Sequence, residues 1–201
     1  MKKITAMVAL LFCVSLGFAQ KEKVRNGKFK ALKGITAYNL TFTYDNVEIP
    51  KFDSEKEFLD EKVKEKEEDE AGAGIAWKEE WFSNRPNHFE PKFIESFNKR
   101  FDDNLVTVKK EAPERKYTIN VAITMMYDGY NVGVWRKDAK LESTITVFET
   151  NNPSNILLEV DYSKVKGRGA MGYDFTSAHR VTEAYAKLAK EFAKKIRKRA
   201  F

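Results

Sequence analysis

Residues 117–127 read Tyr-Thr-Ile-Asn-Val-Ala-Ile-Thr-Met-Met-Tyr, and this stretch decides the class of fold. Every odd-numbered position carries an apolar or aromatic side chain, and Thr118, Asn120 and Thr124 are among the residues between them. Successive side chains of a strand point to opposite faces, so this period of two predicts a strand with one buried face. Asp128-Gly129 follows directly and predicts a turn.

The same alternation returns in two later stretches. Residues 141–148 alternate between apolar side chains and charged or hydroxyl ones, and residues 156–163 do so again after a turn-forming cluster at 151–155. Three neighbouring strands joined by short turns predict an antiparallel meander. A further strand is predicted at 35–49, so we expect an antiparallel sheet of about four to five strands.

Two amphipathic helices complete the predicted fold. The longer one spans about 174–198 and has one apolar stripe, whose residues recur at steps of three and four. A second helix is expected from Glu90-Pro91 onwards, because proline suits a first helical turn. We therefore expect an α+β domain with both helices packed on one face of the sheet. The stripe of the long helix consists of Val181, Tyr185, Leu188, Phe192 and Ile196.

A highly charged segment at about 54–74 interrupts this pattern. Ser54 and Glu57 have the spacing of a capping box, which predicts the start of a helix. The apolar stripe of that helix fades after Val63, and Ala71-Gly72-Ala73-Gly74 ends it. We expect this segment to be an excursion on the surface of one domain. The other expectations are a single α+β domain over 20–201, a loose lead-in at 20–33 and a short helix at 75–82.

Residues 1–19 have the three parts of a cleavable secretory signal peptide: a positive start, an apolar run and small residues before the cleavage point. The apolar run is about 12–15 residues long, whereas a membrane-spanning helix needs roughly 20. Cys13, the only cysteine, lies inside the run and is expected to leave with the peptide. These features predict a mature chain without a disulfide or a transmembrane segment. Its expected location is the periplasm, or else the cell surface or the medium.

Charge is modest overall and uneven along the chain. The formal net charge is +6, and two of the positive charges, Lys2 and Lys3, leave with the signal peptide. No nucleic-acid module is recognisable, so a nucleic-acid partner is not expected. Residues 53–70 carry ten acidic residues against four lysines, and residues 174–201 carry eight basic residues against three acidic ones. Such blocks are usual on solvated faces; docking of one block on the other, within the chain or across a dimer, is the alternative.

The candidate motifs for cofactor, metal or catalytic chemistry all have a plainer interpretation. Residues 167–172 fit G-x-G-x-x-G, but a dinucleotide site also needs a parallel strand–helix–strand unit and a later acidic residue. His88 and His179 have no partner at the spacing of metal ligands. Acidic pairs such as Glu79-Glu80 are common on charged helices and do not by themselves indicate sugar hydrolysis. We expect no catalytic residue, no cofactor and no metal, and hence not an enzyme.

Six aromatic residues lie outside the best-patterned stretches and form the candidate interaction surface. Outside a cell, aromatic side chains often stack on sugar rings or anchor protein interfaces. Packing in the core is the alternative for each of them. The six residues are Trp77, Trp81, Phe82, Phe89, Tyr130 and Trp135.

The order of strand, helix, meander and closing helix resembles a group of bacterial envelope domains. The likeness rests on Lys140-Leu141-Glu142-Ser143-Thr144-Ile145-Thr146-Val147-Phe148-Glu149 and, after the glycine turn, on Ala184-Tyr185-Ala186-Lys187-Leu188-Ala189. The resemblance covers about residues 90–201 and concerns the architecture alone. The domains that the chain resembles are the amino-terminal domain of the TolB translocation protein and small periplasmic or outer-membrane lipoproteins. The chain departs from those lipoproteins because it lacks a lipidation cysteine. Its Phe18-Ala19-Gln20 resembles the signal ends of exported Bacteroidetes proteins. The resemblance implies a non-catalytic role in envelope assembly or transport.

The sequence is compatible with three hypotheses of function. The first is a protein-interaction module of the envelope, whose partner is another envelope protein or a second copy of the chain. The second is a carbohydrate- or lipid-binding protein of the periplasm or cell surface that uses the six aromatic residues. The third is a hydrolase of envelope polymers, which would need acidic or histidine side chains that converge in a cleft.

Overall fold

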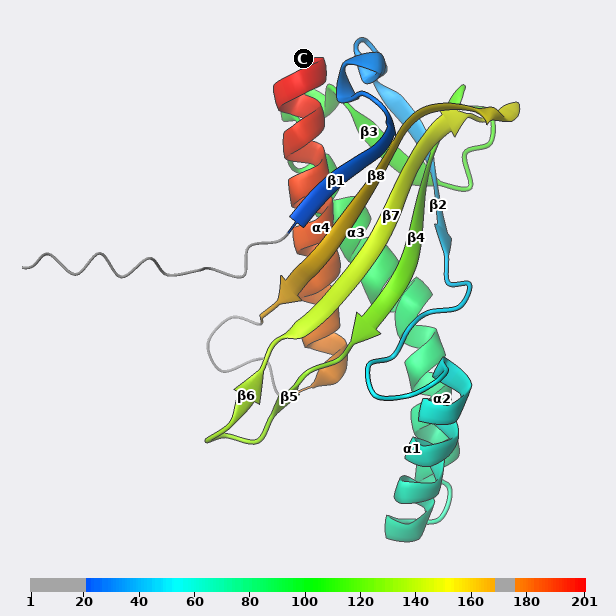
Figure 1. Cartoon of the computed structure of the whole chain (residues 1–201), viewed down its shortest axis with the longest axis vertical. Helices are drawn as coiled ribbons and strands as arrows, with labels where there is room; N and C mark the ends of the chain where they lie inside the picture. The colour runs from blue at the N-terminus through cyan, green and yellow to red at the C-terminus, as the bar shows by residue number, and fades with distance from the viewer. Residues whose placement is uncertain (1–20, 169–175) are drawn as a thin grey trace, which may run out of the picture.

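The computed structural model of the chain describes residues 21–168 and 176–201. Figure 1 shows a curved sheet with the long carboxy-terminal helix packed against it. Six strands form the sheet, in the order β1-β8-β7-β4-β2-β3, and two short strands form a separate hairpin. The strands are β1 (Lys21–Gly27), β2 (Ala37–Thr43), β3 (Thr107–Lys110), β4 (Tyr117–Tyr127), β5 (Tyr130–Asn131), β6 (Arg136–Lys137), β7 (Ala139–Glu149) and β8 (Asn152–Gly167). The α-helices are α1 (Glu55–Asp69), α2 (Ala73–Asn84), α3 (Glu90–Asn98) and α4 (Ser177–Ala200).

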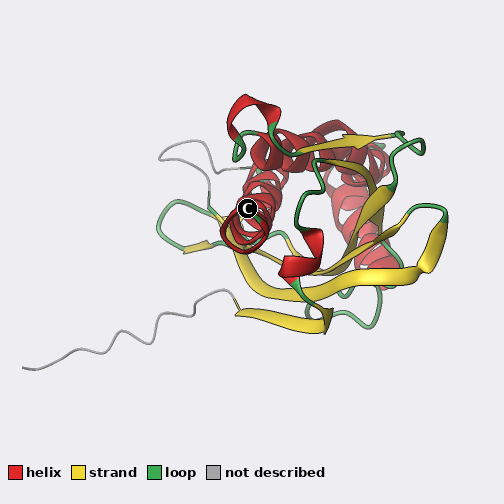
Figure 2. Ribbon diagram, turned by 90° about the horizontal axis from the view of Figure 1, so that it is seen from above, coloured by secondary structure: helices red, strands yellow, loops and turns green. Residues whose placement is uncertain are grey.

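Strands β4, β7 and β8 form the predicted antiparallel meander. Ile119, Val121 and Ile123 of β4 are buried on the face that meets the helices. Figure 2 shows the sheet curling around these helices. The α+β class is confirmed.

Helix α4 covers the sheet with the predicted apolar stripe, and all five residues of the stripe are buried. The helix begins at Ser177, where the hydroxyl of Thr176 accepts a hydrogen bond from the N–H of His179 at 3.3 Å. Residues 174 and 175, where the predicted helix starts, lie outside the described residues. Helix α3 packs beside α4, with the ring centroids of Phe97 and Phe192 separated by 6.1 Å. Both predicted helices therefore lie on one face of the sheet.

The sheet is mixed and has six strands, which corrects the prediction of an antiparallel sheet of four to five. Strand β2 runs parallel to both of its neighbours, β3 and β4. Helices α1 to α3 lie between β2 and β3, and residues 111–116 then carry the chain to the other side of β2. Long connections of this kind permit parallel pairing. The alternation of residues within a strand carries no information about that direction.

Residues 21–32 belong to the fold and are not the loose lead-in that was predicted. Strand β1 pairs with β8 at one edge of the sheet, and Phe29 and Leu32 in the helical turn that follows are buried in the core. An edge strand that faces solvent needs no apolar face, and lysines protect it from pairing with other chains. The lysine-rich composition of β1 is therefore compatible with a strand.

The charged excursion predicted at about 54–74 contains α1, and the short helix predicted at 75–82 is part of α2. The two helices form a pair that extends beyond the sheet (Figure 1). The hydroxyl of Ser54 accepts a hydrogen bond from the N–H of Glu57 at 3.1 Å, as the capping signature predicts. Phe58 contacts the rings of Trp77 and Trp81, which holds the two helices together. The acidic helix α1 and the basic last turn of α4 lie at opposite ends of the molecule (Figure 1). Within the described ranges, no helix combines the length and the apolar character needed to cross a membrane.

The helix that contains Glu90 does not begin there, contrary to the prediction. Helix α2 continues through a π-helical turn (Arg85–Phe89) into α3, and the N–H of Glu90 donates to the carbonyl of Arg85, five residues back. Pro91 has no N–H to donate, and a widened turn before it allows the helix to accommodate the proline. This turn brings both Arg85 and Glu90 against Tyr44, the residue that follows β2.

Candidate functional site: a groove at the open edge of β2

The candidate site lies where β3 ends. Strand β3 pairs with β2 only from Ala37 to Leu40, whereas β4 pairs with β2 on the other side as far as Thr43. Among the described residues, 41–43 therefore have a strand neighbour on one side only, and we call this segment the open edge. In a parallel pair, alternate residues of a strand direct their N–H and C=O groups to opposite sides. Part of the backbone of the open edge consequently points away from the sheet.

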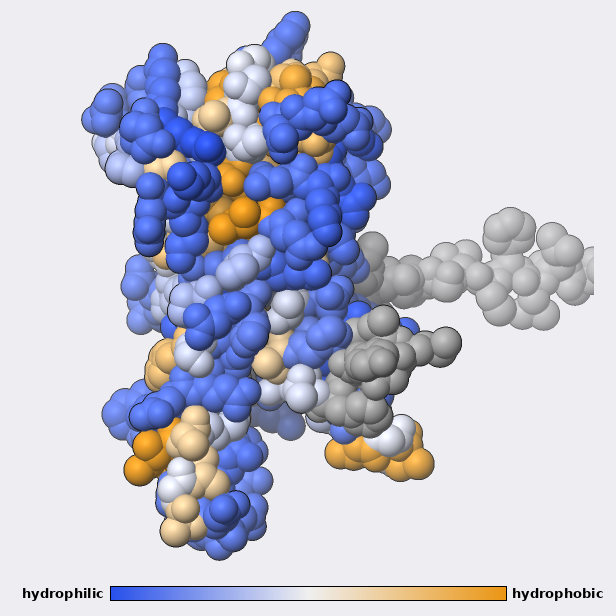
Figure 3. Space-filling view, turned by 180° about the vertical axis from the view of Figure 1, so that it is seen from behind, coloured by the Kyte–Doolittle hydropathy of each residue, from blue (hydrophilic) through white to orange (hydrophobic). Residues whose placement is uncertain are grey.

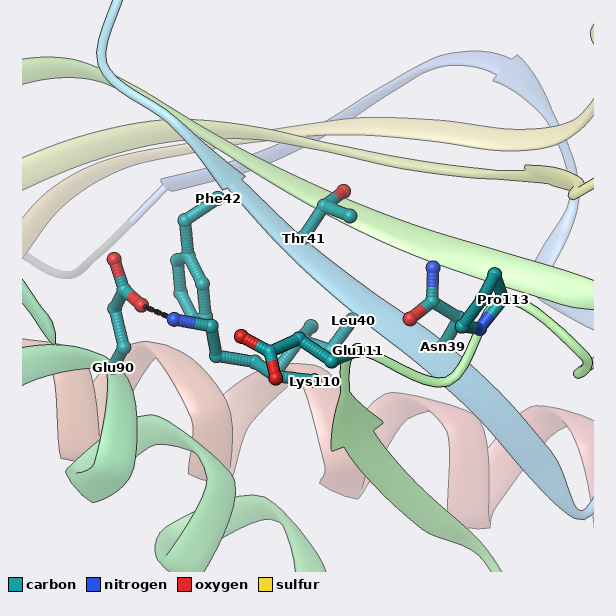
Figure 4. A pocket seen from close by; sticks show the side chains of 8 residues that line it. All are labelled: Asn39, Leu40, Thr41, Phe42, Glu90, Lys110, Glu111 and Pro113. Carbon is teal, nitrogen blue, oxygen red and sulfur yellow. Dashed lines mark hydrogen bonds and ion pairs between the residues drawn. The ribbon is translucent and has the colours of Figure 1, made fainter.

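A groove of about 610 Å³ lies along the open edge (Figure 4). Asn39 and Thr41 reach this edge groove from one face of β2, and Leu40 and Phe42 reach it from the other. The groove therefore follows the edge of the strand rather than either of its faces. Its volume is within the range of known ligand sites. The lining residues are Asn39, Leu40, Thr41, Phe42, Glu90, Lys110, Glu111 and Pro113.

One wall of the edge groove is an ion pair between Glu90 of α3 and Lys110, the last residue of β3 (Figure 4). Glu90 is only 5% exposed, so its carboxylate needs partners for both oxygens. Oε2 accepts from Lys110, and Oε1 accepts from the hydroxyl of Tyr44 at 3.1 Å. These bonds tie the end of β3 and the residue that follows β2 to α3.

The polar contacts continue from Tyr44 to the helix pair. The guanidinium of Arg85 lies over the Tyr44 ring at 4.4 Å from the centroid, a cation–π contact. Arg85 also forms an ion pair with Glu55, which accepts a hydrogen bond from the indole N–H of Trp81 at 2.7 Å. The chain of contacts from Trp81 to Lys110 therefore joins α1, α2, β2, α3 and β3.

Burial raises the pKa of the Tyr44 phenol, and the neighbouring Tyr185 and Glu90 raise it further. Burial likewise raises the pKa of Tyr185, whose hydroxyl lies 3.5 Å from that of Tyr44. Both phenols are therefore protonated at neutral pH, and Tyr44 can donate to Glu90. This hydrogen bond helps to hold the buried carboxylate in place.

The six aromatic residues predicted to form a surface do not lie together. Trp81 and Phe89 are buried, which corrects their assignment to an exposed surface. Trp77 is partly buried against the core, and Phe89 stacks on Tyr185 with ring centroids 5.1 Å apart. The packing of α2 on α1 and of the π turn on α4 buries these rings. Of the four on this segment, only Phe82 is exposed.

Tyr130 and Trp135, the other two predicted residues, lie on the β5–β6 hairpin and are both exposed. Figure 1 shows this hairpin and the helix pair as separate projections from the body. The predicted surface is therefore divided into two parts, and the larger part is mostly core.

The edge groove was not found from the sequence. The sequence marks Glu90 only as a helix start, and no motif singles out Tyr44 or Lys110 as site residues. The groove exists because β3 is shorter than β2, and the sequence of neither strand shows where its neighbour ends. Strand β3 has four residues, Thr107–Lys110, of which only Val108 is apolar, whereas β2 has seven.

Of the glycine motif, only Gly167 and Arg168 lie among the described residues; His88 lies in the π-helical turn and His179 in the first turn of α4. Gly167 ends β8, where a Cβ would lie 2.0 Å from the carbonyl oxygen of Arg180, so this glycine allows β8 to approach α4. Gly169 and Gly172 of the motif lie outside the described residues. The part of the chain that the structure describes contains no cluster of three His, Cys, Asp or Glu side chains that could hold a metal.

No family model matches the sequence, and no curated protein matches it. Two solved structures with a similar arrangement are PelC dodecamers from Paraburkholderia phytofirmans, one in space group P6 and one, of a variant, in space group C2. The first has 10% sequence identity and a TM-score of 0.39, and the match covers 84% of this chain and 97% of that one. The second has 9% identity and a TM-score of 0.39, with 85% and 97% covered.

Proposed function

We propose that this chain is a non-catalytic binding protein of the bacterial envelope, which holds an extended segment of a partner protein in the edge groove. The observation that carries this proposal is the early end of β3, after which the groove continues along β2. A partner strand placed there would continue the line of β3 and pair with the open edge. Addition of a strand to a sheet edge is a common mode of peptide recognition, in which backbone hydrogen bonds supply affinity.

The side chains of the groove favour a short segment with both apolar and polar residues. Phe42 and Pro113 offer apolar contacts, whereas Glu90 and Lys110 are already paired with each other. Glu111 is exposed at the rim and remains available for a cation on the partner. Because alternate side chains of an extended chain point to opposite sides, apolar residues of the partner would face Phe42 and polar ones the rim.

The envelope location and the role in envelope assembly or transport also belong to the proposal. They rest on the signal-like residues 1–19 and on the resemblance to envelope domains such as that of TolB. Amino-terminal sequencing of the protein recovered from the envelope fraction should give Gln20 as the first residue. Recovery of the intact precursor from the cytosol would contradict the location.

Binding is tested with short random peptides selected by display against the chain from Gln20 onwards, which holds every described residue. Bound peptides should slow amide hydrogen exchange within 41–43. Pro113→Trp places a bulky side chain in the groove and should weaken binding by about ten-fold or more, which is about 1.4 kcal/mol. Glu114→Trp is the matched control, since Glu114 is exposed in the same turn but does not line the groove. Equal affinities of the two variants would contradict the proposal.

The partner is proposed to be a second envelope protein, with a further copy of this chain as the alternative. Sedimentation equilibrium separates the two cases. If copies of the chain occupy each other's edge grooves, the wild type sediments as an oligomer and Pro113→Trp as a monomer. A monomeric wild type that binds the selected peptides supports a different protein as partner.

A further inference from the structure

The β5–β6 hairpin carries the most exposed large apolar side chains of the described residues. At its tip, which we define as residues 132–135, Val134 is 88%, Trp135 is 71% and Val132 is 67% exposed. Figure 1 shows the hairpin extending from the end of the sheet, and Figure 3 shows an apolar patch that stands away from the body there. Single exposed apolar residues are ordinary on a protein surface, but three on one projecting tip are not.

Three of the four amides of the hairpin tip donate hydrogen bonds within the hairpin. The N–H of Val132 donates to the carbonyl of Trp135 at 3.0 Å, and the N–H of Val134 donates to the carbonyl of Val132 at 3.1 Å. The N–H of Gly133 donates to Oδ1 of Asn131 at 3.0 Å. Three successive amides thus need no bond from water or from a partner. An apolar medium penalises unpaired amides heavily, so these three bonds lower the cost of moving the tip out of water.

The base of the hairpin is fixed to the body by α4. Nε of the buried Arg180 donates to the carbonyl of Asp128 at 3.0 Å, and its Nη2 donates to the carbonyl of Gly129 at 3.2 Å. Gly129 lies so close to β6 that an added Cβ would be 2.4 Å from the carbonyl of Lys137. The apolar side chains are therefore presented at the end of an anchored structure.

Cations surround the hairpin behind its apolar tip. Arg136 and Lys137 follow the tip directly, and Lys140 lies opposite Lys166 where β7 pairs with β8. The ammonium of Lys137 lies over the Tyr130 ring at 5.7 Å from its centroid, and that of Lys140 lies over the Tyr127 ring at 5.8 Å. Near the base of the hairpin, Asp138 forms an ion pair with Arg168. An apolar tip followed by tyrosines and cations matches the order of layers in an anionic membrane surface.

We propose that the β5–β6 hairpin inserts its tip into the interface of an anionic lipid bilayer. Val132, Val134 and Trp135 enter the boundary of the acyl chains, while Arg136 and Lys137 remain at the level of the phosphate groups. A protein partner would also cover apolar side chains, but it would gain nothing from amides that are already paired. The inference is independent of the edge groove, so the chain could bind a partner protein while its hairpin holds it at a membrane.

The test is flotation of the chain from Gln20 onwards with vesicles of phosphatidylcholine, with and without phosphatidylglycerol. The wild type should float with the anionic vesicles, less with the neutral ones, and less at high salt. The triple variant Val132→Ser, Val134→Ser and Trp135→Ser should reduce the bound fraction by about ten-fold or more. A matched control is Ile75→Ser with Leu105→Ser, which removes exposed apolar side chains elsewhere.

A second measurement places the tip within the bilayer. Brominated lipids quench a tryptophan that enters the acyl region, so vesicles that contain them should quench the wild type and not Trp135→Phe. Circular dichroism of the triple variant should match that of the wild type, because the replaced side chains are exposed. Flotation that the triple variant leaves unchanged overturns the proposal. So does a wild type that ignores vesicles and self-associates through the tip, which would make the hairpin a protein interface.

Discussion

The hydroxyl of Tyr44 donates a hydrogen bond to Oε1 of Glu90 over 3.1 Å, and this bond joins the end of β2 to α3. The bond lies beside the edge groove, where Glu90 also forms an ion pair with Lys110, the last residue of β3. The shape of the groove therefore depends on a buried carboxylate with two partners from different strands.

Tyr44→Phe removes one of those partners and keeps the ring that lies under Arg85. Loss of a hydrogen bond to a buried charged group costs about 1–3 kcal/mol, so the free energy of unfolding should fall by that amount. Urea unfolding followed by circular dichroism measures the change. Tyr130→Phe is the control, since its phenol is exposed on the hairpin, and an equal loss in both variants would contradict the assigned role of the bond.

The same phenol predicts how stability changes at alkaline pH. Burial raises the pKa of Tyr44 in the folded state above the unfolded value of about 10. The contribution of the Tyr44 phenol to the free energy of unfolding is fully present below pH 10. It is lost as the pH rises further, because only the unfolded state then releases the proton. The slope is about 1.4 kcal/mol per pH unit for each such group.

Tyr44→Phe should therefore flatten the fall in unfolding free energy above pH 10 by about that slope. Tyr185→Phe should act in the same direction, since burial also raises the pKa of Tyr185. Urea unfolding at several alkaline pH values provides the comparison. Parallel curves for wild type and Tyr44→Phe would show that the phenol titrates alike in both states.

The meander and the long helix could be predicted because each of them buries one face. Every second residue of β4 and every third or fourth residue of α4 meets the core, so periodicity alone identifies them. Val181 and Ile196 are as buried as the pattern requires. The direction of β2 could not be predicted in this way, since it depends on how three intervening helices return the chain to the sheet.

Burial of the aromatic residues could not be predicted from their neighbours in sequence. Trp81 follows two glutamates and Trp135 precedes two basic residues, yet the first is in the core and the second is exposed. The difference arises from the pairing of α2 with α1 and from the projection of the hairpin. The open edge escaped prediction for a similar reason, because it is defined by a strand that stops rather than by residues that are present.

Asp128, at the base of the hairpin, should make the protein less stable as the pH rises from acid to neutral. Burial raises its pKa, and Arg180 lowers it in part. The folded state then holds this proton more tightly than the unfolded state, whose pKa is about 3.9. The contribution of Asp128 to the free energy of unfolding consequently falls as the pH rises from about 4 through the folded-state pKa of this carboxyl.

Asp128→Asn removes this dependence, so the variant should gain stability relative to the wild type between acid and neutral pH. Thermal unfolding at a series of pH values measures the difference. Asp60→Asn is the control of opposite sign, because the hydrogen bond from Lys56 lowers the pKa of Asp60 at an exposed position. A difference between Asp128→Asn and the wild type that does not vary with pH would contradict the prediction.

Gly167→Ala should be among the most disruptive small substitutions in the chain. A Cβ at this position would lie 2.0 Å from the carbonyl oxygen of Arg180 and 2.6 Å from the amide nitrogen of Ala184. Both atoms belong to the backbone of α4 and cannot rotate away, so the helix must move from β8. Overpacking of this kind costs typically about 1–3 kcal/mol, and a backbone contact places the expected loss at the upper end.

Gly34→Ala separates this steric effect from the general cost of replacing a glycine. Gly34 has a φ of +80° and no atom within 4 Å of an added Cβ, so only the backbone strain of about 1 kcal/mol is expected. Thermal unfolding of both variants should therefore show a clearly larger loss for Gly167→Ala. Because Arg180 also anchors the hairpin, displacement of α4 should in addition speed amide exchange at Val132 and Val134. Equal losses in the two variants would mean that β8 and α4 are not in such close contact, and the first glycine of the motif would need another explanation.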